Sequence, residues 1–118
     1  MIQKHKEQRV AVFVDVQNLY YSAKNLYQSK VNFGALLSET VAGRKLIRAN
    51  AYVIRGPNSE DDNFFSALEK QGYDVKAKDL QVYAGGTKKG DWDVGLTIDA
   101  IKISRNVDSI ILISGVRL

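Results

Sequence analysis

An uninterrupted apolar run that ends in a carboxylate is the feature that most restricts how this chain can fold. Residues 9–14 read RVAVFV, and Asp15 follows them directly. A Val-rich run without polar alternation is typical of a strand buried on both faces, as in a parallel sheet covered by helices. The run therefore predicts a buried strand whose end presents a carboxylate.

Helical and strand-like patterns alternate along the rest of the chain. Apolar spacing and end signals predict helices over residues 17–28, 32–43, 59–72 and 91–105. The segments between them predict strands over residues 45–54, 73–83 and 109–114. The 73–83 strand alternates like an exposed or edge strand, and the 91–105 helix, apolar on two faces, is expected to be well buried.

This alternation predicts an α/β fold, namely a three-layer, doubly wound, mostly parallel sheet with right-handed crossovers. With the 9–14 strand central, the predicted strand order is 3-2-1-4. Ligands bind such sheets at the carboxyl ends of the strands, where the order reverses. The ends that meet there carry Asp15 and Ser114, so we expect function at that point.

Composition excludes several kinds of chemistry. The 118 residues, expected to form a polar leader (1–8) and a single domain (9–118), include no cysteine and one histidine, His5. Disulfides, thiolate zinc sites and Cys nucleophiles are excluded, and the lone histidine in the leader argues against Ser-His-Asp triads and His-based metal sites. Carboxylates, hydroxyls, amides and lysines must supply any chemistry.

Charge and hydropathy say less about partners. The longest apolar run, Val10–Val14, is far shorter than a membrane span, and the N-terminus is too polar for a signal peptide, so we expect a cytoplasmic protein with no membrane partner. The net charge of +4 is compatible with a polyanionic partner, but a basic leader on a near-neutral domain explains it equally well.

Asp15 and Asn18 can share one crevice at the end of the first strand. A carboxylate and an amide there can hold a hard cation, which prefers oxygen ligands, and can orient a phosphate. Asp15 can equally be the cap of the helix that follows, a role that would not require Asn18. The residues alone leave both interpretations open.

The 91–105 helix carries two further acids. Asp93 shares a face with small residues but also fits the first turn of a helix. Each residue of a helix advances roughly 100° about the helix axis, so Asp99, six residues after Asp93, lies about 240° further round. It is therefore not on the face of Asp93. The spacing instead favours a solvated pair of Asp99 with Lys102.

The AGGTKKG segment (84–90) is predicted to be a loop. It fails the P-loop test because Asp91 stands where lysine is required. Lys88 and Lys89 can contact a phosphate backbone, although a solvent-exposed connection is the commoner use of such a loop.

Three motifs together resemble the NYN domain, a PIN-like group that includes the DUF88 family. They are DVQN after the first strand, GDWDVGLTIDAI in the long helix and SIILISG on the last strand, and the resemblance runs from Arg9 to Gly115. It implies a nuclease in which clustered acids hold Mg²⁺ or Mn²⁺ and RNA phosphodiesters are hydrolysed.

The resemblance also implies roles for individual residues. Its first motif matches Asp15 and Asn18, its helix motif matches Asp93 and Asp99, and its third matches Ser114 and Gly115. The implied catalytic set is Asp15, Asn18, Asp93 and Asp99, of which the three acids are the implied metal ligands. The expected RNA contacts are Ser114, from the third motif, and Lys88 and Lys89, from their charge.

The chain departs from the family pattern at its end. The family continues Ser-Gly-Asp-x-Asp, whereas this chain has Val116 and Leu118 and then stops. We therefore expect missing C-terminal elements, weak metal binding and little or no activity, with a homo-oligomer or a partner chain covering the incomplete sheet. The alternatives are a non-catalytic RNA-binding or regulatory module, or a small-molecule-binding domain with Asp15 as phosphoacceptor. The absence of a nucleotide fingerprint and the presence of Asn18 argue against the latter.

Overall fold

The computed structural model describes residues 6–16, 31–55, 60–79, 81–82, 88–89 and 93–114. Its elements, in chain order, are β1 (Arg9–Asp15), α2 (Phe33–Val41), β2 (Lys45–Arg55), α3 (Glu60–Lys70), β3 (Asp74–Asp79), β4 (Gln81–Val82), β5 (Lys88–Lys89), α4 (Asp93–Ile103) and β6 (Ser109–Ile113). The helix predicted over residues 17–28 lies outside the described residues.

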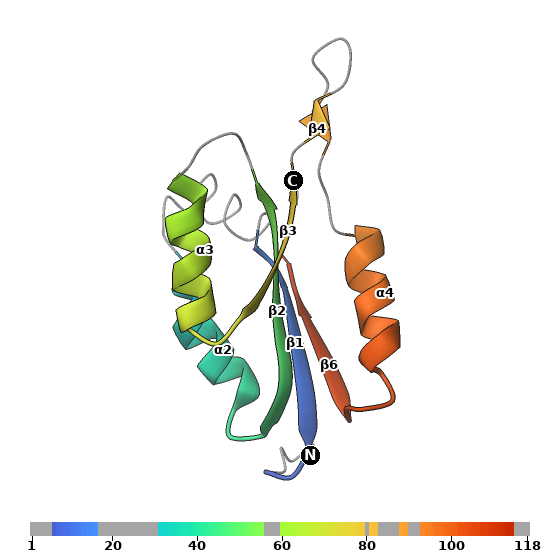
Figure 1. Ribbon diagram of the computed structural model, residues 1–118. Coiled ribbons are helices and arrows are strands. Elements are labelled where there is room, and N and C mark those ends of the chain that lie inside the picture. The colour runs from blue at the N-terminus through green and yellow to red at the C-terminus, as the bar shows by residue number, and fades with distance from the viewer. Residues whose placement is uncertain are drawn as a thin grey trace.

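The main sheet has four parallel strands in the order β3-β2-β1-β6 (Figure 1). This arrangement confirms the predicted α/β class, the order 3-2-1-4 and the edge position of the third strand. In the register, Asp15 lies beside Tyr52 of β2, and Val14 lies beside Ile113 of β6. The carboxyl ends of β1 and β6 therefore meet at the same edge of the sheet.

Helices cover both faces of the sheet, with α2 and α3 on one side and α4 on the other (Figure 1). Alternate residues of β1 serve the two faces, since Val12 and Val14 pack under α2 and α3, whereas Ala11 and Phe13 pack under α4. The α2–α3 side buries the larger cluster, which includes Phe33, Leu37, Phe65, Leu68 and Tyr73.

The ends of α2 follow the predicted chemistry closely. The Asn32 side chain accepts a hydrogen bond from the backbone N–H of Ala35 at 3.0 Å, which makes it the predicted N-cap. The helix ends one residue before the predicted stop, because Ala42 already adopts the left-handed conformation (φ 51°) and Gly43 continues it (φ 78°).

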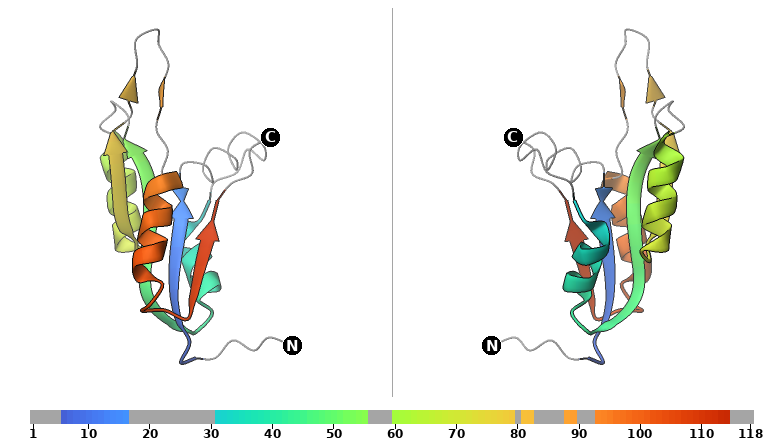
Figure 2. Two further views of the ribbon diagram at one scale, coloured as in Figure 1. Left: turned by 90° about the vertical axis from the view of Figure 1, so that its right-hand side faces the viewer. Right: turned by 90° about the vertical axis from the view of Figure 1, so that its left-hand side faces the viewer.

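The prediction of one strand over residues 73–83 is correct only in part: Asp74–Asp79 form β3, Gln81–Val82 form β4 in a separate sheet, and Leu80 lies outside the described residues. β3 pairs with β2 only as far as Asp79, opposite Arg55, where β2 itself ends. β4 pairs antiparallel with β5, so Lys88 and Lys89 lie in a short strand and not in the predicted loop. This two-stranded unit projects beyond the carboxyl edge of the main sheet (Figure 2).

The prediction that α4 is buried on both faces is also wrong. Leu96, Ala100 and Ile103 pack towards the sheet, as expected. The opposite face is exposed, because no described element lies over it, and its apolar side chains are Val94 (70% exposed), Ile98 (46%) and Ile101 (68%). Among the described helices, none combines the length and apolarity needed to cross a membrane.

Candidate functional site

Asp15 ends the central strand and is 8% exposed, one of two buried polar residues among those described. Side chains alternate along a strand, and Phe13 faces α4, so Asp15 lies on the α4 face as well. A carboxylate buried at the carboxyl edge of a parallel sheet is costly unless it is bonded to other groups. The position is therefore suited either to ligand binding or to helix capping.

Asp99 approaches the same face from α4. Its carboxylate accepts a 2.9 Å hydrogen bond from the hydroxyl of Tyr52, the residue beside Asp15 in the strand register. The predicted solvated pair of Asp99 with Lys102 is wrong, since the ion pairs among the described residues do not include it. The helical spacing allowed that pair, but Tyr52 is a closer donor and draws the carboxylate towards the sheet.

Tyr52 is the middle member of a short hydrogen-bonded chain. The Asn50 amide Nδ2 donates to the Tyr52 oxygen at 2.9 Å, and the Tyr52 hydroxyl donates to Asp99. Burial, and then the neighbouring carboxylate of Asp99, raise the pKa of Tyr52 well above its usual value, although the Asn50 donor opposes the shift. Tyr52 therefore stays a neutral donor that fixes the orientation of Asp99.

At the Asn50 end of this series of hydrogen bonds, one acceptor has no partner among the described residues. Asn50 is 2% exposed, and its carbonyl Oδ1 has no hydrogen-bond partner among the described residues. The amide cannot simply be reversed, because Tyr52 spends its one proton on Asp99 and needs a donor from Asn50. A buried acceptor without a partner costs about 1–3 kcal/mol, so this oxygen is suited to accept a hydrogen bond from a donor outside the described residues.

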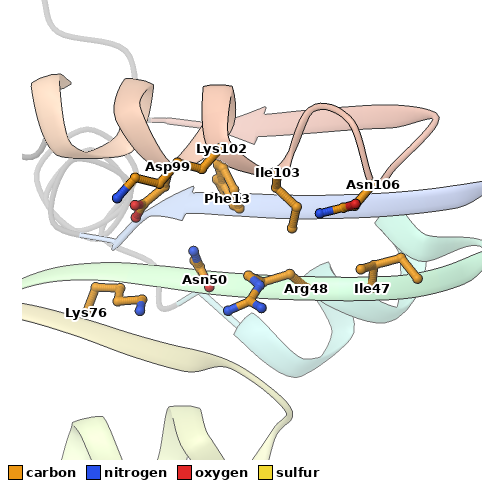
Figure 3. A pocket seen from close by; sticks show the side chains of 9 residues that line it. All are labelled: Phe13, Ile47, Arg48, Asn50, Lys76, Asp99, Lys102, Ile103 and Asn106. Atoms are coloured by element: carbon orange, nitrogen blue, oxygen red, sulfur yellow. The ribbon is translucent and has the colours of Figure 1, made fainter.

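A pocket of about 390 Å³ opens beside Asn50, between α4 and the strands β2 and β3 (Figure 3). Arg48, Lys76 and Lys102 bring positive charge to its walls. Asp99 lines the same pocket, and Figure 3 shows it with Lys102 on the α4 side, facing the polar side chains of the strands. The pocket and the candidate site at Asp15 are thus joined through Asp99 and Tyr52.

Sequence reasoning missed Asn50 and Tyr52. Residues 45–54 were interpretable simply as a strand, and periodicity does not show which hydroxyl meets which helix. One signal was present: Asn50 is an amide in the middle of the apolar stretch that ends β2, where strands disfavour it.

The remaining predicted residues are only partly described. Asn18, Val116 and Leu118 lie outside the described residues. Asp93 is the first residue of α4, at the helix end nearest the carboxyl edge of the sheet (Figure 1), and Ser114 follows β6 and is exposed. Lys88 and Lys89, in β5, belong to the projecting unit.

The donor chemistry suits a hard divalent cation, because Asp15 and Asp99 supply carboxylate oxygens on one face of the sheet. The described residues alone do not assemble a group of three metal-ligating side chains. A cation held by Asp15 would therefore also need the groups that the motifs nominate at Asp93 and Asn18.

Comparisons with known proteins identify one similar solved structure and one matching family. The chain is similar to the crystal structure of a protein of unknown function from Vibrio parahaemolyticus, with 34% sequence identity, a TM-score of 0.84, and coverage of 98% of this chain and 71% of that one. No curated protein matches it. The family model for the NYN domain matches residues 9–117. The chain therefore belongs to the NYN domain family, whose members are PIN-like nuclease domains that generally depend on divalent metal ions.

Proposed function

We propose that this protein is a metal-dependent ribonuclease domain that hydrolyses RNA phosphodiesters. One observation carries the proposal: in a chain that matches the NYN domain over residues 9–117, a buried carboxylate, Asp15, ends the central strand at the edge where parallel sheets bind ligands. With no cysteine and one histidine in the chain, carboxylates are the groups available for such chemistry.

Asp15 and Asp93, together with Asp99, would hold Mg²⁺ or Mn²⁺. The ion, when bound, supplies Lewis-acid chemistry by making water more acidic and by offsetting charge on the phosphate. Asp15 comes from the central strand and the other two acids from one helix, so the ligands would approach from two elements.

The other residues of the chain bind and orient. Tyr52 donates to Asp99 and so limits the rotation of that carboxylate. Asn18 would orient a phosphate oxygen or the attacking water. Lys88, Lys89 and Ser114 would contact the RNA backbone, where lysines act as point charges that release counterions on binding.

Turnover by this chain should be slow. Val116 and Leu118 stand where resembling proteins carry carboxylates, and fewer anionic ligands offset the dehydration of the cation less well. We expect Val116→Asp with Leu118→Asp to raise Mn²⁺-dependent cleavage, because the two substitutions add anionic ligands for the cation.

Cleavage of a labelled single-stranded RNA with Mn²⁺ tests the proposal in both the native chain and the acid-restored chain that carries Val116→Asp and Leu118→Asp. Asp15→Asn should remove the activity, because it deletes a ligand charge while keeping the size of the side chain. Glu39→Gln, which alters an exposed acid of α2 on the other face, should leave it unchanged. Cleavage that survives Asp15→Asn in both chains, or no cleavage by the acid-restored chain, would contradict the proposal.

A non-catalytic RNA-binding module is the second candidate, and Val116 and Leu118 favour it. It predicts RNA binding in EDTA at full strength, together with no cleavage even after the acids are restored. Its binding would also be indifferent to Asp15→Asn.

A further inference from the structure

We infer that the pocket between α4 and the β2–β3 strands is a subsite for one nucleotide of the RNA strand, next to the proposed metal site. The inference rests on the proposed function for its substrate class. In this inference, cationic side chains of the pocket bind a phosphate, and the Asn50 oxygen accepts one specific hydrogen bond. The metal site requires neither of these groups.

Positive charge in the pocket exceeds what the described carboxylates neutralise. Arg48 and Lys76 share a single acid, Asp74, at 3.8 and 3.6 Å, both longer than a hydrogen bond. Lys102 reaches the pocket from α4 and forms none of the ion pairs found among the described residues. These three cations, from three elements, line one concave space together with the single carboxylate of Asp99, so positive charge is in excess there and favours a phosphate.

Asn50 supplies the second and independent indication of a ligand. Its carbonyl oxygen is buried, unpartnered among the described residues, and cannot be exchanged with the amide nitrogen. Figure 3 shows the Asn50 side chain between the strands and α4, within the group that lines the pocket. The acceptor requires an N–H or O–H donor, so an inorganic anion alone would leave it unsatisfied.

A nucleotide combines the groups that the pocket calls for. Its phosphate suits the cations, and its ribose 2′-hydroxyl or a base N–H suits the Asn50 acceptor. The pocket also has apolar walls, formed by Phe13, Ile47 and Ile103, against which a flat base can pack. A volume of about 390 Å³ is within the range of small-ligand sites.

The position of the pocket favours a strand over a free nucleotide. Asp99 lines the pocket, and its Tyr52 partner lies beside Asp15 in the sheet. A phosphodiester at the Asp15 edge therefore has a neighbouring nucleotide within reach of the pocket along the same face of the sheet. Occupancy would hold the strand in place while leaving the metal ligands free.

Binding of fluorescein-labelled oligouridine RNA, measured by anisotropy in EDTA, tests the subsite without cleavage. Arg48→Gln and Lys102→Gln should each weaken binding about tenfold and reduce the salt slope by about one. Lys70→Gln, a matched loss of charge on α3 at the opposite face, should change affinity less than twofold.

Asn50→Leu tests the acceptor, using oligouridine and oligodeoxyuridine as paired probes. The leucine is similar in size and removes an unsatisfied polar group. If the donor is the 2′-hydroxyl, affinity should fall about tenfold for RNA alone. If the donor is the uracil N–H, affinity should fall equally for both probes.

Several outcomes would overturn the inference. One is that the Lys70 control loses as much affinity as the pocket variants, and another is that the pocket variants bind like the native chain. Should a variant fail to fold, amide NMR of the native chain with the RNA decides: shifts at Asn50, Lys76 and Lys102 support the subsite, and their absence rejects it.

The result is separable from that of the proposed function. Pocket-dependent binding in EDTA without Mn²⁺-dependent cleavage by the acid-restored chain would keep the subsite and reject the nuclease. Mn²⁺-dependent cleavage that is unchanged by Arg48→Gln and Lys102→Gln would keep the nuclease and reject the subsite.

Discussion

The two faces of the sheet differ in how they treat buried polar groups. Under α2 and α3, the hydroxyl of Tyr73 donates to the backbone carbonyl of Phe33 at 2.6 Å, and aromatic rings meet edge to face around it. Under α4, the described core is smaller and buries Asp15 and Asn50, the latter with an unpartnered oxygen. The described polar atoms thus differ between the faces: the Tyr73 hydroxyl has an acceptor, whereas the Asn50 oxygen has no donor among the described residues.

The two faces are therefore expected to differ in what they contribute to stability and in the ligands that they can bind. A satisfied apolar cluster contributes the free energy of burial, whereas a buried acceptor without a described partner, such as the Asn50 oxygen, subtracts from it. Proteins retain such groups mainly where a ligand uses them. We therefore expect the α2–α3 face to contribute more to the free energy of unfolding than the α4 face.

The largest expected effect comes from truncating one side chain on each face. Leu68 is 1% exposed in the α2–α3 cluster and Ile103 is 8% exposed under α4. Leu68→Ala should lower the free energy of unfolding by about 3 kcal/mol, and Ile103→Ala by about 2 kcal/mol or less, because the site beside the pocket is less closely packed. Urea unfolding measures both, and equal or reversed losses would break the comparison.

A smaller effect is expected from Tyr73→Phe. Loss of the hydroxyl leaves the buried carbonyl of Phe33 without that donor and should cost about 1–2 kcal/mol. It should not alter RNA or Mn²⁺ binding, because Tyr73 lies on the face opposite the site.

Alkaline pH sharpens this test. Burial raises the pKa of Tyr73 to about 12 from 10.0, so the folded state binds the proton more tightly than the unfolded state. The stabilisation is complete below pH 10 and is lost as the pH rises towards 12. Urea unfolding across that interval should show a shallower decline for Tyr73→Phe than for the native chain, and identical declines would reject the assignment.

The smallest effect is expected on the outer face of α4. Ile101 is 68% exposed, so Ile101→Gln should change the free energy of unfolding by less than about 0.5 kcal/mol. A loss above about 1 kcal/mol in thermal or urea unfolding would mean that this face is covered in solution and that the contrast between the two sides of the sheet is overstated.

The sequence predicts the sheet better than the site. The run at residues 9–14 and the alternation of elements predict the strand order, because burial and handedness leave few topologies for such a pattern. The pattern fails where partners decide the outcome: Gln81 and Val82 pair with β5 and not with the main sheet, and the outer face of α4 has no described cover.

The candidate site, too, could be predicted from the sequence only in part. Asp15 could be found because a carboxylate directly after a buried strand lies at a fixed edge of the sheet. Asp99 was nominated through the family resemblance, because its orientation towards the sheet depends on Tyr52, 47 residues away in the sequence. Spacing along one helix carries no information about that contact, and the spacing of Asn50 and Tyr52 on β2 does not reveal the pocket.

The central claim is that the α4 face holds a divalent cation through Asp15. Mn²⁺ titration followed by electron paramagnetic resonance tests it directly, comparing the native chain with Asp15→Asn and with the control Glu39→Gln from α2. We predict that Asp15→Asn weakens Mn²⁺ binding at least about tenfold, since one ligand charge is lost, and that the control binds like the native chain. Equal Mn²⁺ affinity for the native chain and Asp15→Asn would contradict the account.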